Sequence, residues 1–108
     1  MEKITIMQGD AYSIPIEILT SDGIPASNVN FKDVEITLGH ITKRLSNNEV
    51  FYNPNEKIFE FPLTQKETFS LYESKYDIQV RVKVSENQVI GFEIKEIAII
   101  KSKSKAVL

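Results

Sequence analysis

The chain has 108 residues, which suits one compact domain with a modest core and leaves no room for two independent cores. It is 42% hydrophobic and 26% charged, a composition typical of a folded domain and not of a disordered polyelectrolyte. The balance of 13 basic against 15 acidic residues argues against a dedicated nucleic-acid binder, and the lack of cysteine excludes disulfides, thiolate nucleophiles and zinc–thiolate clusters.

No targeting segment is apparent in the sequence. The first residues carry no apolar stretch of signal-peptide length, and the longest apolar run, Ile97–Ile100, is far shorter than the ~20 residues of a membrane helix. We therefore expect a protein that is made in the cytoplasm and does not contact a membrane.

Alternation of apolar and polar residues with a period of two dominates the chain and predicts β-strands. The predicted strands lie, in chain order, around Ile4–Ile6, Tyr12–Leu19, Val34–Leu38, Val50–Tyr52, Phe59–Leu63, Tyr76–Val84 and Ile90–Ile99. The Tyr76–Val84 segment is the clearest, because β-branched residues alternate there with charged or polar ones. We predict a central core that contains Ile16, Ile78, Val80 and Val82.

Several residues in these strands predict local irregularities. Pro15 and Pro62 have no N–H to donate, so each should face a sheet edge or a bulge. In the last strand the apolar residues fall on even positions up to Ile94 and on odd positions from Ile97. The change at Lys95-Glu96 is typical of a β-bulge or of a strand that changes sheets. Tyr12 and Tyr76 fall on the same side of their strands as the apolar residues and are expected in the core. Tyr76 also fits a corner tyrosine at the start of its strand.

One short helix is expected between the strands. Thr64-Gln65-Lys66-Glu67 matches a capping box, in which the threonine hydroxyl and the glutamate carboxylate satisfy each other's backbone N–H groups. About seven short strands and this helical connector predict an all-β, antiparallel β-sandwich, with a barrel as the less favoured architecture. We expect a single sandwich domain over residues 1–100, followed by a basic tail over residues 101–108.

The order of these segments resembles a known group of proteins. Gln8-Gly9-Asp10 precedes an alternating strand, a Gly-Ile-Pro turn precedes Val34–Leu38, and the connector Leu63–Thr68 precedes Tyr76–Val80. This arrangement is similar to small immunoglobulin-like β-sandwich proteins of tailed phages and prophages, related to N-terminal domains of baseplate and tail proteins. The resemblance implies a virion structural or adaptor module, made in the host cytoplasm, that binds other virion proteins and copies of itself.

Catalytic and metal sites find little support in the sequence. His40 is the sole histidine, and no nucleophile elbow or cysteine accompanies it, so we interpret it as a turn or surface residue. The loop carboxylates Asp10, Asp22, Asp33 and Asp77 match no calcium-loop spacing, and turn formation accounts for them. We expect no cofactor, no metal and no enzymatic activity.

Two pairs of residues are candidate interface positions. Ala98 and Ile100 place apolar side chains on the outer face of the last strand, where either the Ala26–Lys32 loop or, as we favour, another subunit covers them. Phe51 and Tyr52 are aromatic residues in a polar stretch. With Tyr72 they are also the residues that an alternative function, a carbohydrate- or surface-binding module, would use. The Lys101–Lys105 run is interpreted as a solvated terminus in preference to a docking arm.

Overall fold

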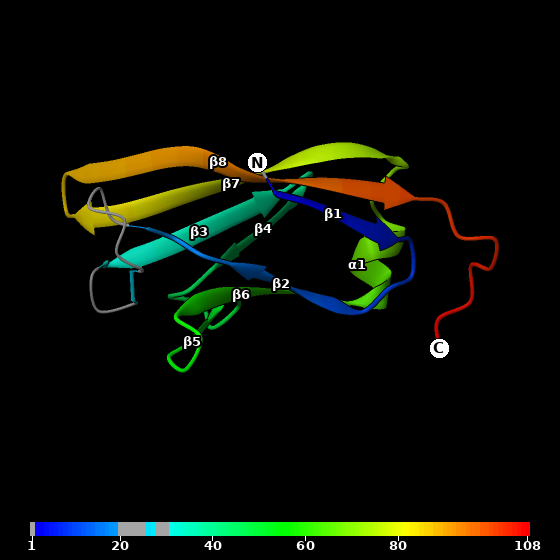
Figure 1. The fold of residues 1–108 in the computed structure, drawn as a ribbon, viewed down its shortest axis with the longest axis horizontal. Helices are drawn as coiled ribbons and strands as arrows, with labels where there is room; N and C mark the ends of the chain where they lie inside the picture. Colours follow the sequence, from blue (N-terminus) through cyan, green and yellow to red (C-terminus); the bar gives the residue numbers. More distant parts are fainter. Residues whose placement is uncertain (1, 20–25, 28–30) are drawn as a thin grey trace.

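The chain folds into two facing β-sheets with one short helix at their side (Figure 1). The computed structural model describes residues 2–19, 26–27 and 31–108. The large sheet contains, in spatial order, β1 (Glu2–Met7), β8 (Gln88–Ile100), β7 (Ser74–Ser85), β3 (Asp33–Leu38) and β4 (Ile41–Arg44). The small sheet contains β2 (Tyr12–Ile16), β6 (Ile58–Leu63) and β5 (Phe51–Asn53), and the helix α1 (Gln65–Phe69) joins β6 to β7.

The core between the sheets is built from the residues that the alternation places inward. Ile16, Ile78, Val80 and Val82 are all buried, which confirms the predicted central core. The prediction for Tyr12 is wrong, because its side chain is 42% exposed. Tyr12 has the apolar parity but begins its strand, where the opposite sheet no longer covers it.

The large sheet is mixed, which corrects the prediction of a purely antiparallel sandwich. β1 pairs in parallel with β8, from Glu2 beside Lys95 to Met7 beside Ile100. After β1 the chain turns at Gly9 and enters the small sheet, so β1 forms no hairpin with its sequence neighbour. It pairs instead with the last strand, and the whole intervening domain serves as the long connection that parallel pairing requires.

β4 is a strand that the alternation did not predict. Its inward residues are Ile41 and Lys43. Because Lys43 is not apolar, the segment lacks the alternation of apolar and polar residues from which the other strands were predicted. The Lys43 ammonium lies 2.9 Å from Glu67 Oε1, donates to the Pro62 carbonyl and lies 5.6 Å from the centre of the Phe61 ring. Burial raises the pKa of Glu67, but the Thr64 N–H and the Lys43 ammonium outweigh it and hold that pKa below its usual value.

The predicted irregularities are present. Pro15 lies on β2, which is an edge strand. Pro62 lies on β6, two residues past Glu60, whose pair with Phe51 is the last one between β6 and β5. Neither proline therefore removes a ladder hydrogen bond. The pairing of β7 with β8 shifts register opposite Lys95 and Glu93, which makes the intervening Ile94 the extra residue of a bulge, immediately before the predicted position.

The predicted capping box is also present and anchors the β1–β2 turn. Thr64 accepts from the Glu67 N–H, and the Glu67 carboxylate accepts from the Thr64 N–H. One turn later, the buried Thr68 hydroxyl accepts from the Gly9 N–H at 2.9 Å and donates to the Asp10 carbonyl at 2.8 Å. The Gln8-Gly9-Asp10 segment and the helical connector, far apart in the sequence, are thus one docked unit.

Tyr76 closes the other side of this connector. Its hydroxyl donates to the Tyr72 carbonyl at 3.0 Å, four residues upstream, while its ring packs against the core. This is the geometry of a corner tyrosine at the start of a strand, and it confirms that prediction.

Candidate interaction surfaces

Phe51 and Tyr52 lie on β5 and point to opposite faces of the small sheet. The Tyr52 ring packs at 5.1 Å, centroid to centroid, on Phe59 of the core. Phe51 is 53% exposed and points outward beside Glu60. Of the two, only Phe51 is therefore available on the outer surface.

Phe51 belongs to an outer face that carries little charge, which we name the small-sheet face. Its outward residues are Ser13 and Pro15 of β2, Ile58, Glu60 and Pro62 of β6, and Phe51 and Asn53 of β5. Glu60 is the one charged residue of these seven, and its carboxylate accepts a hydrogen bond from the Ser13 hydroxyl at 2.9 Å. An outer sheet face is usually polar, so this composition is typical of a contact surface.

Ala98 and Ile100 lie at the C-terminal end of β8, which is not an edge strand because β1 covers it. Ile100 is 38% exposed beside Met7, which is 42% exposed, while Ala98 lies half-buried between Thr5 and Lys75. We name Met7, Ala98 and Ile100 the end patch. It is a small apolar area on the outer face of the large sheet.

The described parts of the 26–32 loop do not cover this patch. Ala26 is buried in the core, and its N–H donates to the Ile18 carbonyl. The Lys32 N–H donates to the Lys83 carbonyl, which lies near the C-terminal end of β7. The end patch lies beside the other end of β7 (Figure 1). Positions 28–30 of the proposed cover lie outside the described residues.

The free edge of β1 is closed at its C-terminal end. The Met7 N–H donates to Asp10 Oδ2 at 2.9 Å, and the Met7 carbonyl accepts from the Asp10 N–H at 3.0 Å. The Gly9-Asp10 turn thereby occupies the backbone groups that another strand would use to extend the sheet. A contact made at this end must consequently use side chains and not strand addition.

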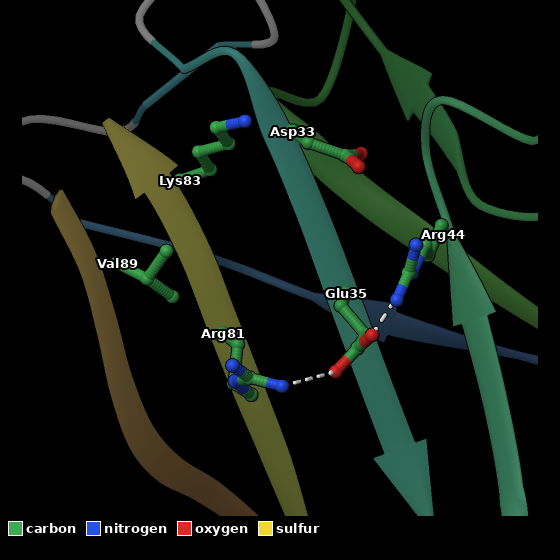
Figure 2. Close-up of a pocket in the computed structure, with 6 residues that line it drawn as sticks. All are labelled: Asp33, Glu35, Arg44, Arg81, Lys83 and Val89. Atoms are coloured by element: carbon green, nitrogen blue, oxygen red, sulfur yellow. Dashed lines mark hydrogen bonds and ion pairs between the residues drawn. The ribbon is translucent and has the colours of Figure 1, made fainter. Parts of the chain in front are cut away.

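A charged hollow lies on the outer face of the large sheet, toward the β7–β8 hairpin (Figure 2). It has a volume of about 190 Å³ and is lined by Asp33, Glu35, Arg44, Arg81, Lys83 and Val89, which we name the arginine groove. Glu35 Oε2 lies 2.9 Å from Arg44 Nε, and Glu35 Oε1 lies 3.2 Å from Arg81 Nη1. Sequence reasoning missed this groove because outward charges on separate strands carry no spacing signal.

Asp33 has a structural role at the rim of the groove. Its carboxylate accepts from the Ser46 N–H at 3.0 Å, from the Ser46 hydroxyl at 2.8 Å and from its neighbour, the Val34 N–H. Asp10 is engaged by Met7, and Asp22 lies outside the described residues. Within the described chain no three His, Cys, Asp or Glu side chains come together as metal ligands.

His40 contacts a serine, a pairing that the sequence did not indicate. Its Nε2 lies 3.1 Å from the hydroxyl of Ser70, the C-cap of α1, and that hydroxyl donates to the Glu67 carbonyl. This contact links the β3–β4 turn to the end of the helix.

Comparison with known proteins gives no assignment for this chain. No family model matches it, and no curated protein matches it. In the described part of the chain, no helix has the length and apolar character needed to cross a membrane.

Proposed function

We propose that this protein is an immunoglobulin-like structural or adaptor module of a tailed-phage or prophage virion, in the tail, baseplate or neck. It would act by contacts with other virion proteins and with copies of itself, without catalysis or a cofactor. The sequence resemblance provides the virion context, and the strand order and surfaces support a module built for protein contacts.

The strand order supports an immunoglobulin-like topology. Immunoglobulin sandwiches place strands B, E and D in one sheet and C, F and G in the other, with C′ added in variable-type domains. Here β2, β6 and β5 correspond to the first set, and β3, β7, β8 and β4 to the second. The Tyr76–Tyr72 hydrogen bond lies at the E–F corner, as a tyrosine corner does.

The small-sheet face is the observation that carries the proposed function. Phe51, Ile58 and the two prolines lie on a surface whose single charge, Glu60, is bonded to Ser13. The outward side chains of β7, in contrast, are charged or polar along the strand, as on a solvated face. A face with exposed apolar groups and few charges gains most from being covered by another protein.

The alternative, a carbohydrate-binding module, should gather aromatic side chains at loop tips. Phe51 lies on a strand and Tyr52 packs on the core. Tyr72 is 84% exposed but follows α1, which Figure 1 shows apart from β5, to its right. These three aromatic residues form no common platform, so we favour the assembly module.

The test is incorporation into particles. Particles purified by density-gradient centrifugation from the host that encodes this chain should contain it in constant ratio to the other particle proteins. A Phe51→Ser variant should fold but be depleted from the particles. Tyr72→Ser, which removes an even more exposed aromatic residue elsewhere, should be retained. A chain that is absent from the particles would refute the proposal.

A further inference from the structure

The two arginines of this chain lie together in the arginine groove. Of the 13 basic residues, only Arg44 and Arg81 are arginines, and they come from different strands. The register of the sheet puts Arg81, Glu35 and Arg44 in one row across β7, β3 and β4 (Figure 2). Arginine differs from lysine in its planar fork of N–H donors, which matches the two oxygens of a carboxylate.

Glu35 holds both arginines in place but uses only part of each guanidinium. It contacts Arg44 through Nε and Arg81 through Nη1. Each guanidinium carries five N–H donors, and among the described side chains Glu35 is the only ion-pair partner of either arginine. The Glu35 side chain is 15% exposed, whereas both arginine side chains are 53% exposed. The remaining donors are thus pre-positioned at the surface.

The row is open to solvent, and the residues that line the hollow carry one more positive than negative charge. Gly91 lies opposite Arg81 on β8, so the residue that pairs with Arg81 there contributes no side chain to the row. Half-exposed Val89 forms one wall of the hollow, which has a volume of about 190 Å³. Among the lining residues, Arg44, Arg81 and Lys83 carry three positive charges and Asp33 and Glu35 carry two negative ones. Asp33 is bonded to Ser46, and the Lys83 ammonium lies 3.5 Å from Glu86 Oε2, so the two arginines carry the positive charge that is left for a ligand.

We propose that the arginine groove binds the carboxylate side chains of an acidic segment of a partner protein. The segment would lie across β3 and β7, with a carboxylate accepting from the unused N–H groups of Arg44 and Arg81 and with apolar contact to Val89. Charge-assisted, bidentate bonds of this kind fix orientation as well as adding affinity. The inference rests on the proposed function, since it names the chemistry of one partner of a contact module.

The experiment is an NMR titration of the full chain at low ionic strength, with hexaglutamate as the probe and hexaglutamine as the matched neutral peptide. Backbone amides of Glu35, Arg44, Arg81 and Gly91 should shift with hexaglutamate and not with hexaglutamine. Arg44→Gln and Arg81→Gln should each weaken this binding by up to about fivefold, the range for a half-exposed ion pair. Lys66→Gln removes an exposed charge on α1 and should leave it unchanged.

The outcomes separate the possibilities. Shifts confined to the Lys101–Lys105 run, or unchanged in Arg44→Gln/Arg81→Gln, would overturn the proposal. Acetate at the same carboxylate concentration should shift the groove amides less than hexaglutamate does. Equal shifts would mean that the groove accepts any small carboxylate and would overturn the assignment to a protein segment. The titration is independent of particle incorporation, so a chain that binds hexaglutamate but is absent from particles would refute only the proposed function.

Discussion

Gly9→Ala should be one of the most damaging small substitutions in this chain. Gly9 has a φ of +93°, and a Cβ built there would lie 2.6 Å from Phe69 Cζ. Holding alanine in left-handed backbone costs about 1–2 kcal/mol. Forcing a methyl group against a packed ring costs about 1–3 kcal/mol more. The expected loss is therefore about 2–5 kcal/mol, a large part of the roughly 5–15 kcal/mol by which a domain is stable.

The assay is urea unfolding, followed by circular dichroism, of four variants: Gly9→Ala, Gly91→Ala, Phe69→Leu and the Gly9→Ala/Phe69→Leu double variant. Gly91→Ala is the matched control, since its backbone is not left-handed and its Cβ would lie 3.6 Å from Arg81 Cγ, an ordinary contact. It should change the free energy of unfolding by no more than about 0.5 kcal/mol. Phe69→Leu removes the ring carbon nearest Gly9. In the Gly9→Ala background it should therefore recover free energy of unfolding, with a coupling energy of about 1–3 kcal/mol between the two substitutions.

Two results would refute this reasoning. If Gly9→Ala were no more destabilising than Gly91→Ala, the β1–β2 turn would not be held against α1 as described. If Phe69→Leu gave no recovery, the loss would come from backbone conformation alone and the steric contact would be wrong.

Four further expectations can be checked on the purified protein. Val80→Asp buries an unpaired charge at a fully buried position and should unfold the domain; an unchanged melting temperature would contradict the assigned inward face of β7. Glu67 has a pKa below the usual 4.5, so its charged form stabilises the fold above that pH and the contribution is lost as pH falls through the folded pKa. Glu67→Gln should therefore lower the free energy of unfolding at pH 7 and flatten its decline in acid. Excess chelator should leave the melting temperature unchanged, whereas a drop of several degrees would indicate a bound metal. Ile100→Lys should leave the fold intact but lower the mass seen in light scattering, and a parent protein that is already monomeric would exclude a subunit contact at the end patch.

Local patterns in the sequence determined most of the elements. Apolar alternation located every strand except β4, and the capping box of Thr64 and Glu67 located the helix. These signals are readable because burial of one sheet face imposes a period of two, and because a capping box satisfies backbone groups within four residues. The corner role of Tyr76 and the bulge in β8 belong to the same class, since each leaves a trace within a few residues.

Pairings between distant segments were decided only by the tertiary structure. The parallel register of β1 on β8 has no local signature, and the inward Lys43 of β4 is paired only because Glu67 of α1 and the Pro62 carbonyl of the small sheet meet it. Tyr12 has the right parity for the core, yet its exposure depends on where the facing sheet ends. The arginine groove arises in the same way, because Arg44 and Arg81 become neighbours through the order of strands and not through their spacing in the chain.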